Sequence, residues 1–227
     1  MGFLTDWFNR EPKKEIEKNA PQKQGIVLFF EVLGREHWEL CKLNLIMIIS
    51  CTPIITIPAA ITAMSKVMMF MFMDKPVDTF GDFFATFKAE WKRSTLVGLI
   101  YIPLLVMTMF GQYFYSNVME NFLLYTISML ASAIVLIVGF YLFPMIAVMD
   151  INLRGILKNA ILLAFLRMPQ NILTLIVMVL LSLFVLLLLP ASILIILFIH
   201  FAMIGLITNF CAYTALKKFV IQENLYE

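Results

Sequence analysis

The sequence predicts an all-α protein that crosses a membrane several times. Sixty-two per cent of its 227 residues are hydrophobic and only 14% are charged, a composition too apolar for the surface of a soluble domain of this length. Several apolar runs reach or exceed the roughly 18 residues that a helix needs to cross a bilayer. We therefore predict a polytopic helical bundle with six membrane segments, both termini in the cytoplasm and amphipathic helices at the membrane interface.

The N-terminal region divides into a tail and a first helix. Residues 1–24 carry charges of both signs and lack the apolar core of a signal peptide, so we expect a polar, mobile tail. Residues 25–227 then form a single integral-membrane domain. Its first part, residues 25–40, has apolar side chains at approximately helical spacing with acidic and basic residues between them, which predicts an amphipathic helix.

Two prolines, Pro53 and Pro58, interrupt the first apolar region. Proline breaks or kinks a helix interior, so the region is either one kinked span or a hairpin. If the region were a single span, the seven Lys and Arg of residues 1–42 and the five of residues 65–94 would lie on opposite sides of the membrane. Turning back at the prolines places all 17 on one side, as the positive-inside rule requires. We therefore predict a hairpin with arms at about 41–53 and 58–74.

The length of these arms leaves two alternatives open. Counted from Trp38 to Pro53 and from Pro58 to Met73, each arm has about 15 residues, or roughly 22 Å of helix, whereas the hydrocarbon core is about 30 Å thick. The hairpin either spans the bilayer fully or is re-entrant, with its tip packed against other helices because exposed backbone is not tolerated at that depth.

Four later segments are continuous apolar runs, and the connections at 114–121 and Pro190 contain no Lys or Arg. We expect these two connections on the outer side. The second segment is long for the bilayer core, so we expect it to tilt, to kink near Pro144 or to project. The four segments cover about residues 95–113, 122–149, 172–189 and 191–213.

A stripe of aromatic residues precedes the third membrane segment. Its members, from Phe80 to Trp91, recur with the spacing i, i+3, i+4, i+7 and i+11, which places them on one face of a helix. A further short helix is expected within residues 154–171. Such helices lie in the membrane interface or bind a cytoplasmic partner. The candidate partner contacts are Phe83, Phe84, Phe87, Lys88, Trp91, Lys158 and Asn159.

Catalytic and metal chemistry are not indicated. The four later segments contain no Asp, Glu, Lys or Arg, the residues that usually mark function at membrane depth. Two intramembrane polar candidates remain, His200 and Asn209, and we expect His200 to hydrogen-bond a neighbouring helix. No triad, HExxH motif or phosphate loop is recognisable. We predict no enzyme, no cofactor, no metal and, at a net charge of +2, no nucleic-acid partner.

A methionine run offers one metal alternative. Met68, Met69, Met71 and Met73 lie close together, and thioethers favour Cu(I). No Cys or His accompanies the run, so we favour flexible packing residues.

Three stretches resemble the YesL family of small bacterial membrane proteins. The first, "LNLIMIISCTPIITIPAAITAM", matches through Asn44, Pro53 and Thr56, although the family usually has glycine where this chain has Pro58. The second, "DFFATFKAEWKRST", matches through Phe83, Phe84, Phe87 and Lys88. The family often has asparagine where this chain has Glu90 or Trp91.

The third stretch runs from "YLFPMIAVMD" to "FLRMPQNIL" and matches through Phe143, Pro144, Lys158, Asn159, Ala160 and Pro169. The resemblance covers about residues 43–172. Family members are commonly encoded beside carbohydrate ABC importers and are regarded as accessory to sugar uptake, and no catalytic residues are established for them.

The resemblance implies a non-enzymatic accessory or regulatory subunit of a carbohydrate ABC importer in the bacterial plasma membrane. Its partners would be the lipid bilayer and the permease or ATPase subunits. The alternative is a small-solute channel or facilitator with its own path, lined by polar side chains at membrane depth: Asn44, Thr56, Gln112, His200 and Asn209.

Overall fold

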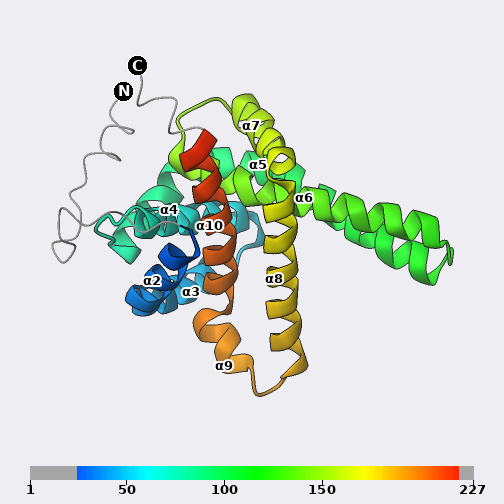
Figure 1. Cartoon of the computed structure of the whole chain (residues 1–227), viewed down its shortest axis with the longest axis horizontal. Coiled ribbons are helices and arrows are strands. Elements are labelled where there is room, and N and C mark those ends of the chain that lie inside the picture. Colours follow the sequence, from blue (N-terminus) through cyan, green and yellow to red (C-terminus); the bar gives the residue numbers. More distant parts are fainter. Residues whose placement is uncertain (1–24, 220–227) are drawn as a thin grey trace.

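The computed structural model describes residues 25–219, and every regular element within this range is helical (Figure 1). The predicted tail, residues 1–24, lies outside the described residues. The elements are α2 (Ile26–Arg35), α3 (His37–Ser50), the 3₁₀ turn η1 (Ile54–Thr56), α4 (Ile57–Phe72), α5 (Thr79–Asn117), α6 (Phe122–Val148), α7 (Leu153–Leu166), α8 (Met168–Leu187), α9 (Ile193–Ile195), the π-helix η2 (Ile196–His200) and α10 (Phe201–Phe219).

Helix α4 forms the centre of the bundle. Of its 16 residues, 14 are buried, as expected for a helix that is apolar on all sides. It packs against α5, α6, α10 and α3. Small residues let the neighbouring backbones approach closely: a Cβ at Gly98 of α5 would lie only 2.1 Å from Cγ of Pro58.

Five of the described helical stretches are long and apolar enough to cross a membrane: 54–72, 79–117, 122–148, 168–187 and 193–219. The first predicted segment, 41–53, corresponds to α3, whose 14 residues extend about 21 Å and which is not among the five. The chain is thus an all-helical membrane protein. The number of six segments and the side of the termini stay predictions.

The chain turns at the proline pair, as predicted. Helix α3 ends at Ser50 and α4 begins at Ile57. The Thr56 hydroxyl lies 2.6 Å from the carbonyl oxygen of Ser50 at the end of α3, and Pro58 lies in the first turn of α4, where no N–H is needed. Ile54 is 76% exposed, so the chain's own helices do not cover the tip in the way that the re-entrant alternative requires.

Two pairs of helices extend away from this centre. The hairpin α5–α6 and the hairpin formed by α8 with α9–α10 leave the bundle in different directions (Figure 1). Only 11% of the most apolar window of α5, and 11% of that of α8, is buried, against 72% for α4. The outward faces of these helices are therefore available to lipid or to another protein.

Three predicted segments have different boundaries in the structure. The region 25–40 is not one helix, because the chain breaks at Glu36 between α2 and α3. The aromatic stripe and the segment 95–113 belong to a single helix of 39 residues, α5, whose N-terminus is capped by the Asp78 carboxylate accepting from Gly81 N–H. The last segment is interrupted by the π-helix η2.

Candidate functional site

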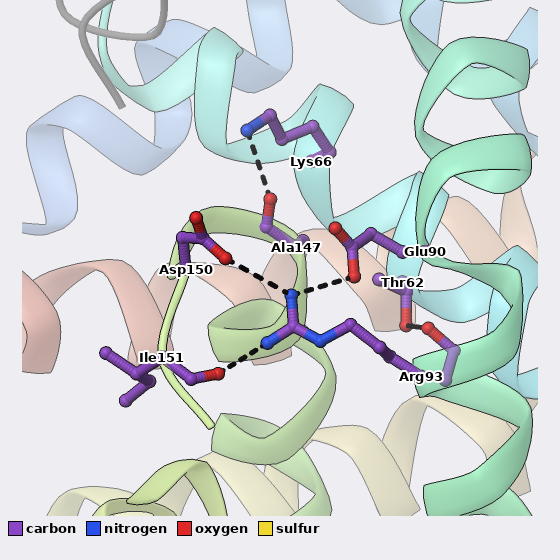
Figure 2. A network of polar contacts seen from close by, with 8 residues as sticks. Thr62, Lys66, Glu90, Arg93, Ala147, Asp150 and Ile151 are labelled. Carbon is purple, nitrogen blue, oxygen red and sulfur yellow. Dashed lines mark hydrogen bonds and ion pairs between the residues drawn. The ribbon is translucent and has the colours of Figure 1, made fainter. Parts of the chain in front are cut away.

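Charged side chains gather where α4, α5 and the α6–α7 connection meet (Figure 2). Helix α4 contributes Lys66, α5 contributes Glu90 and Arg93, and the connection contributes Asp150. Arg93 Nη1 lies 3.1 Å from a Glu90 oxygen and 3.9 Å from an Asp150 oxygen. Lys66 is buried in a helix that is long and apolar enough to cross a membrane, and ionisable residues in such helices are costly and commonly mark function. This charged network is therefore the candidate site.

Lys66 connects the central helix to the end of α6. Its side chain is buried, and Nζ donates to the carbonyl oxygen of Ala147 at 3.0 Å. Ala147 lies in the last turn of α6, where carbonyl groups lack partners within the helix and where a cation is favoured by the helix dipole. The same ammonium lies 5.3 Å from the ring centre of Phe70, a distance suited to a cation–π contact.

Arg93 joins three chain segments. Besides its two carboxylate partners, its Nη2 donates to the carbonyl oxygen of Ile151, just before α7. Arginine suits this role because its planar guanidinium offers five donors in a fixed arrangement. One residue further on, the Ser94 hydroxyl donates to Thr62 at 2.9 Å. The network therefore fixes α5 to α4 and α7 at the place where α5 leaves the bundle.

Asn44 supports the break in the last membrane segment. Its side-chain amide is fully buried. Nδ2 donates to the carbonyl oxygens of Ile196 at 3.1 Å and Leu197 at 2.7 Å, and Oδ1 accepts from Ala202 N–H at 2.9 Å. A π-helix shifts the backbone hydrogen bonds by one residue and often occurs at functional sites. Asn44 thus supplies the partners that this irregular segment needs.

A third buried polar cluster connects α6, α8 and α10. The Tyr141 hydroxyl donates to the Asn171 side chain, whose Nδ2 donates to Ala164 at 2.8 Å. The Cys211 thiol lies 3.2 Å from Asn171 Oδ1. Such interhelical hydrogen bonds stabilise membrane bundles, and we assign this cluster a packing role.

The motif prolines and Phe143 also belong to the packing framework. Phe143 is buried and meets Tyr101 edge to face at 5.4 Å between ring centres. Pro144 is buried inside α6. Pro169, in the first turn of α8, and Pro53, before η1, both lie at positions that proline tolerates.

The aromatic stripe divides between the core and the surface. Phe83 is fully buried, so its prediction as a partner contact is wrong: it packs into the core and stacks on Phe87 at 6.1 Å between ring centres. Phe84 and Trp91 are 45% and 47% exposed, and Lys88 is exposed as well. The stripe divides because α4 and its neighbours cover only one edge of it.

Two other candidates, Lys158 and Asn159, lie on α7. Lys158 is exposed and Asn159 is half-buried. The hydrogen bond from Arg93 to Ile151 holds the start of this helix against α5, so the candidate contacts of α5 and α7 are attached to one network.

The intramembrane polar residues do not act together. Within residues 25–219, His200 Nδ1 has no hydrogen-bond partner, in contrast to the expected interhelical bond. Asn209 Nδ2 donates to the carbonyl oxygen of Gly205 in its own helix, and Gln112 donates to Ser132 across the α5–α6 hairpin. With Asn44 bound to η2 and the Thr56 hydroxyl bound to Ser50, four of the five side chains proposed for a channel path make hydrogen bonds within the protein.

The methionine run packs into the core. Met68, Met69 and Met71 are at most 1% exposed, and Met68 contacts the position of Gly205, where a Cβ would lie 3.0 Å from its methyl group. Among the described residues, no group of three or more His, Cys, Asp or Glu is arranged to hold a metal ion.

Sequence reasoning missed the charged network. In the sequence alone, three of its members look like ordinary cytoplasmic charges: Glu90, Arg93 and Asp150. Their contacts depend on residues far away along the chain. One signal was present: Lys66 lies in an otherwise apolar helix, where an ionisable residue indicates function.

The fold and this network define the class: a polytopic helical membrane protein with a central buried helix and a charged cluster at the base of a projecting hairpin. A family model described as "Protein of unknown function, DUF624" matches residues 40–112, which is consistent with the YesL-like resemblance. The matched region runs from α3 through most of α5 and includes Asn44, Lys66 and Arg93. No curated protein and no solved structure matches the chain.

Proposed function

We propose that the chain is a non-enzymatic accessory or regulatory subunit of a carbohydrate ABC importer in the bacterial plasma membrane. The resemblance to the YesL family supports the class of partner. The observation that carries the proposal is an exposed aromatic face on α5, formed by Phe80, Phe84 and Trp91, which are 54%, 45% and 47% exposed. Lys88 adds an exposed positive charge to the same face.

This face is held rigidly, as a binding surface should be. The buried side chain of Phe83 and the partly buried ring of Phe87 attach the other edge of the same helix to the core, and Arg93 bonds to the start of α7. Aromatic anchors on a rigid element lose little conformational freedom on binding and dominate the energy of many interfaces. The permease or ATPase subunit would bind across α5 and α7, with Lys158 at the margin.

Co-purification tests the proposal directly. The tagged full-length chain is extracted from its native membranes in mild detergent, and ABC permease and ATPase subunits are quantified by mass spectrometry. We expect both to be captured from the wild type. The double variant Phe84→Ala/Trp91→Ala should lower capture by about tenfold or more, because truncating a hot-spot aromatic costs about 2 kcal/mol or more.

Phe122→Ala is the matched control. Phe122 is 82% exposed and lies at the start of α6, at the far end of the α5–α6 hairpin, so its truncation should leave capture unchanged. A monomer without any ABC subunit, together with unchanged sugar uptake after deletion of the gene, would refute the proposal. Flux of a sugar or an ion in reconstituted liposomes would favour the channel alternative instead.

A further inference from the structure

An apolar groove of about 510 Å³ lies between α5, α6 and α7. This volume falls within the roughly 300–1,000 Å³ of small-molecule sites. Helix α5 contributes Leu96, Ile100 and Leu104, and α6 contributes Val135 and Val138. The groove is continuous with the outward faces of the α5–α6 hairpin, so it opens toward the membrane.

Helix α7 forms the third wall. Its groove-lining residues Leu153, Leu157, Ile161 and Phe165 recur every fourth position, which places them on one side of the helix. Buried residues such as Ile156 hold another side of α7 against the bundle. Helix α7 therefore has two apolar sides, one anchored to the protein and one left open to a ligand.

Within the part of the chain that the structure describes, Arg154 is the one charged residue that lines the groove. It is exposed, and among residues 25–219 it makes no hydrogen bond or ion pair. Arg93, in contrast, is engaged with Glu90, Asp150 and Ile151. A guanidinium without a protein partner beside an apolar groove is suited to bind a phosphate through two parallel hydrogen bonds.

We propose that the groove binds one acyl chain of an anionic phospholipid, with the headgroup phosphate on Arg154. Both parts of such a lipid match the groove: an apolar chain for the walls and a negative group for the guanidinium. Basic pockets between membrane helices bind anionic headgroups in this way. A partner helix, about 10–12 Å wide with its side chains, does not fit a space of this volume between three helices.

Native mass spectrometry of the full-length chain tests this site, independently of the proposed importer partnership. The detergent-solubilised protein is titrated with phosphatidylglycerol or phosphatidylethanolamine of identical acyl chains. We expect phosphatidylglycerol to bind several-fold more tightly, because the ammonium group of phosphatidylethanolamine offsets the phosphate charge that Arg154 would bind. Arg154→Gln should lower that affinity about tenfold, the effect of losing a charged hydrogen bond. Lys158→Gln, one turn further along α7 and outside the groove, is the control and should change it less than twofold.

Two groove-filling variants test the acyl-chain part. Val135→Trp and Leu157→Trp fill the groove from opposite walls and should lower the binding of both lipids. Leu157 is 47% exposed, so this variant keeps the test valid if Val135→Trp does not fold. Equal binding of the two lipids by the wild type, equal effects of Arg154→Gln and Lys158→Gln, or unchanged lipid binding by folded Trp variants would each overturn the proposal.

Discussion

Replacing Asn44 by leucine should destabilise the bundle by about 2–5 kcal/mol. Leucine preserves the size of the side chain but removes two donors and one acceptor. The carbonyl groups of Ile196 and Leu197 and the N–H of Ala202 then lose their partners. Hydrogen bonds between membrane helices contribute about 0.6–1.7 kcal/mol each, and the sum over three bonds gives the stated range.

The assay is reversible unfolding in mixed micelles, in which the free energy of unfolding is measured by titration with SDS and followed by circular dichroism. Asn117→Leu is the matched control. Asn117 is exposed at the end of α5 and hydrogen-bonds only nearby groups, the Tyr113 carbonyl and the Ser116 hydroxyl. We expect its replacement to change the free energy by less than about 0.5 kcal/mol, as is usual for surface positions.

A second change tests the cause of the effect. A π-helix contains one residue more than the regular helix it interrupts, so deleting one residue from η2 restores α-helical hydrogen bonding. The deletion should recover much of the stability lost in Asn44→Leu, because the freed carbonyls then find partners in their own helix. If Asn44→Leu is no less stable than Asn117→Leu, the amide does not support η2 and the reasoning fails.

Three further predictions concern packing and topology. Gly98→Val should lower the free energy of unfolding by about 1–3 kcal/mol through overpacking, because its Cβ would overlap the ring of Pro58 on α4. Gly34→Ala is the control and should not destabilise, since no atom lies within 4 Å of the added Cβ. Equal stabilities of the two variants would contradict the observed contact. Tyr141→Phe should lower the free energy of unfolding by about 1 kcal/mol, measured in the same titration, and no change would show that its hydroxyl bond is not stabilising. In a cysteine-free background, an impermeant maleimide should label Asn117→Cys on intact cells but Lys158→Cys only after permeabilisation, and the reverse pattern would refute the predicted orientation.

The sequence predicted the helical class, the turn at the proline pair and the later apolar segments, because composition and local proline chemistry determine these features. It did not predict that residues 79–117 form one helix. The aromatic stripe and the apolar run meet in α5 without a break, and helical periodicity alone cannot show where a continuous helix enters the membrane. The burial of Phe83 was missed for a related reason: a stripe identifies a face, and only the neighbouring helices decide which edge of it is covered.

The charged network required knowledge of contacts between distant residues. Lys66 meets a carbonyl group 81 positions further along the chain, and Arg93 meets one 58 positions away. No local pattern encodes such pairs. The sequence does show Lys66 as an ionisable residue in an otherwise apolar helix. Such a residue indicates a functional site.

Helix α5 connects the two proposed functions physically. Its N-terminal half carries the exposed aromatic face together with Glu90 and Arg93, and the turns from Leu96 to Leu104 in its middle form one wall of the lipid groove. Arg93 also holds the start of α7, which provides another wall of that groove. The Arg93 guanidinium holds α5 against the start of α7. A partner bound on the aromatic face and a lipid bound in the groove would therefore both contact helices that this residue connects. The hydrogen bond from Arg93 to Ile151 is the physical connection between the two proposed sites.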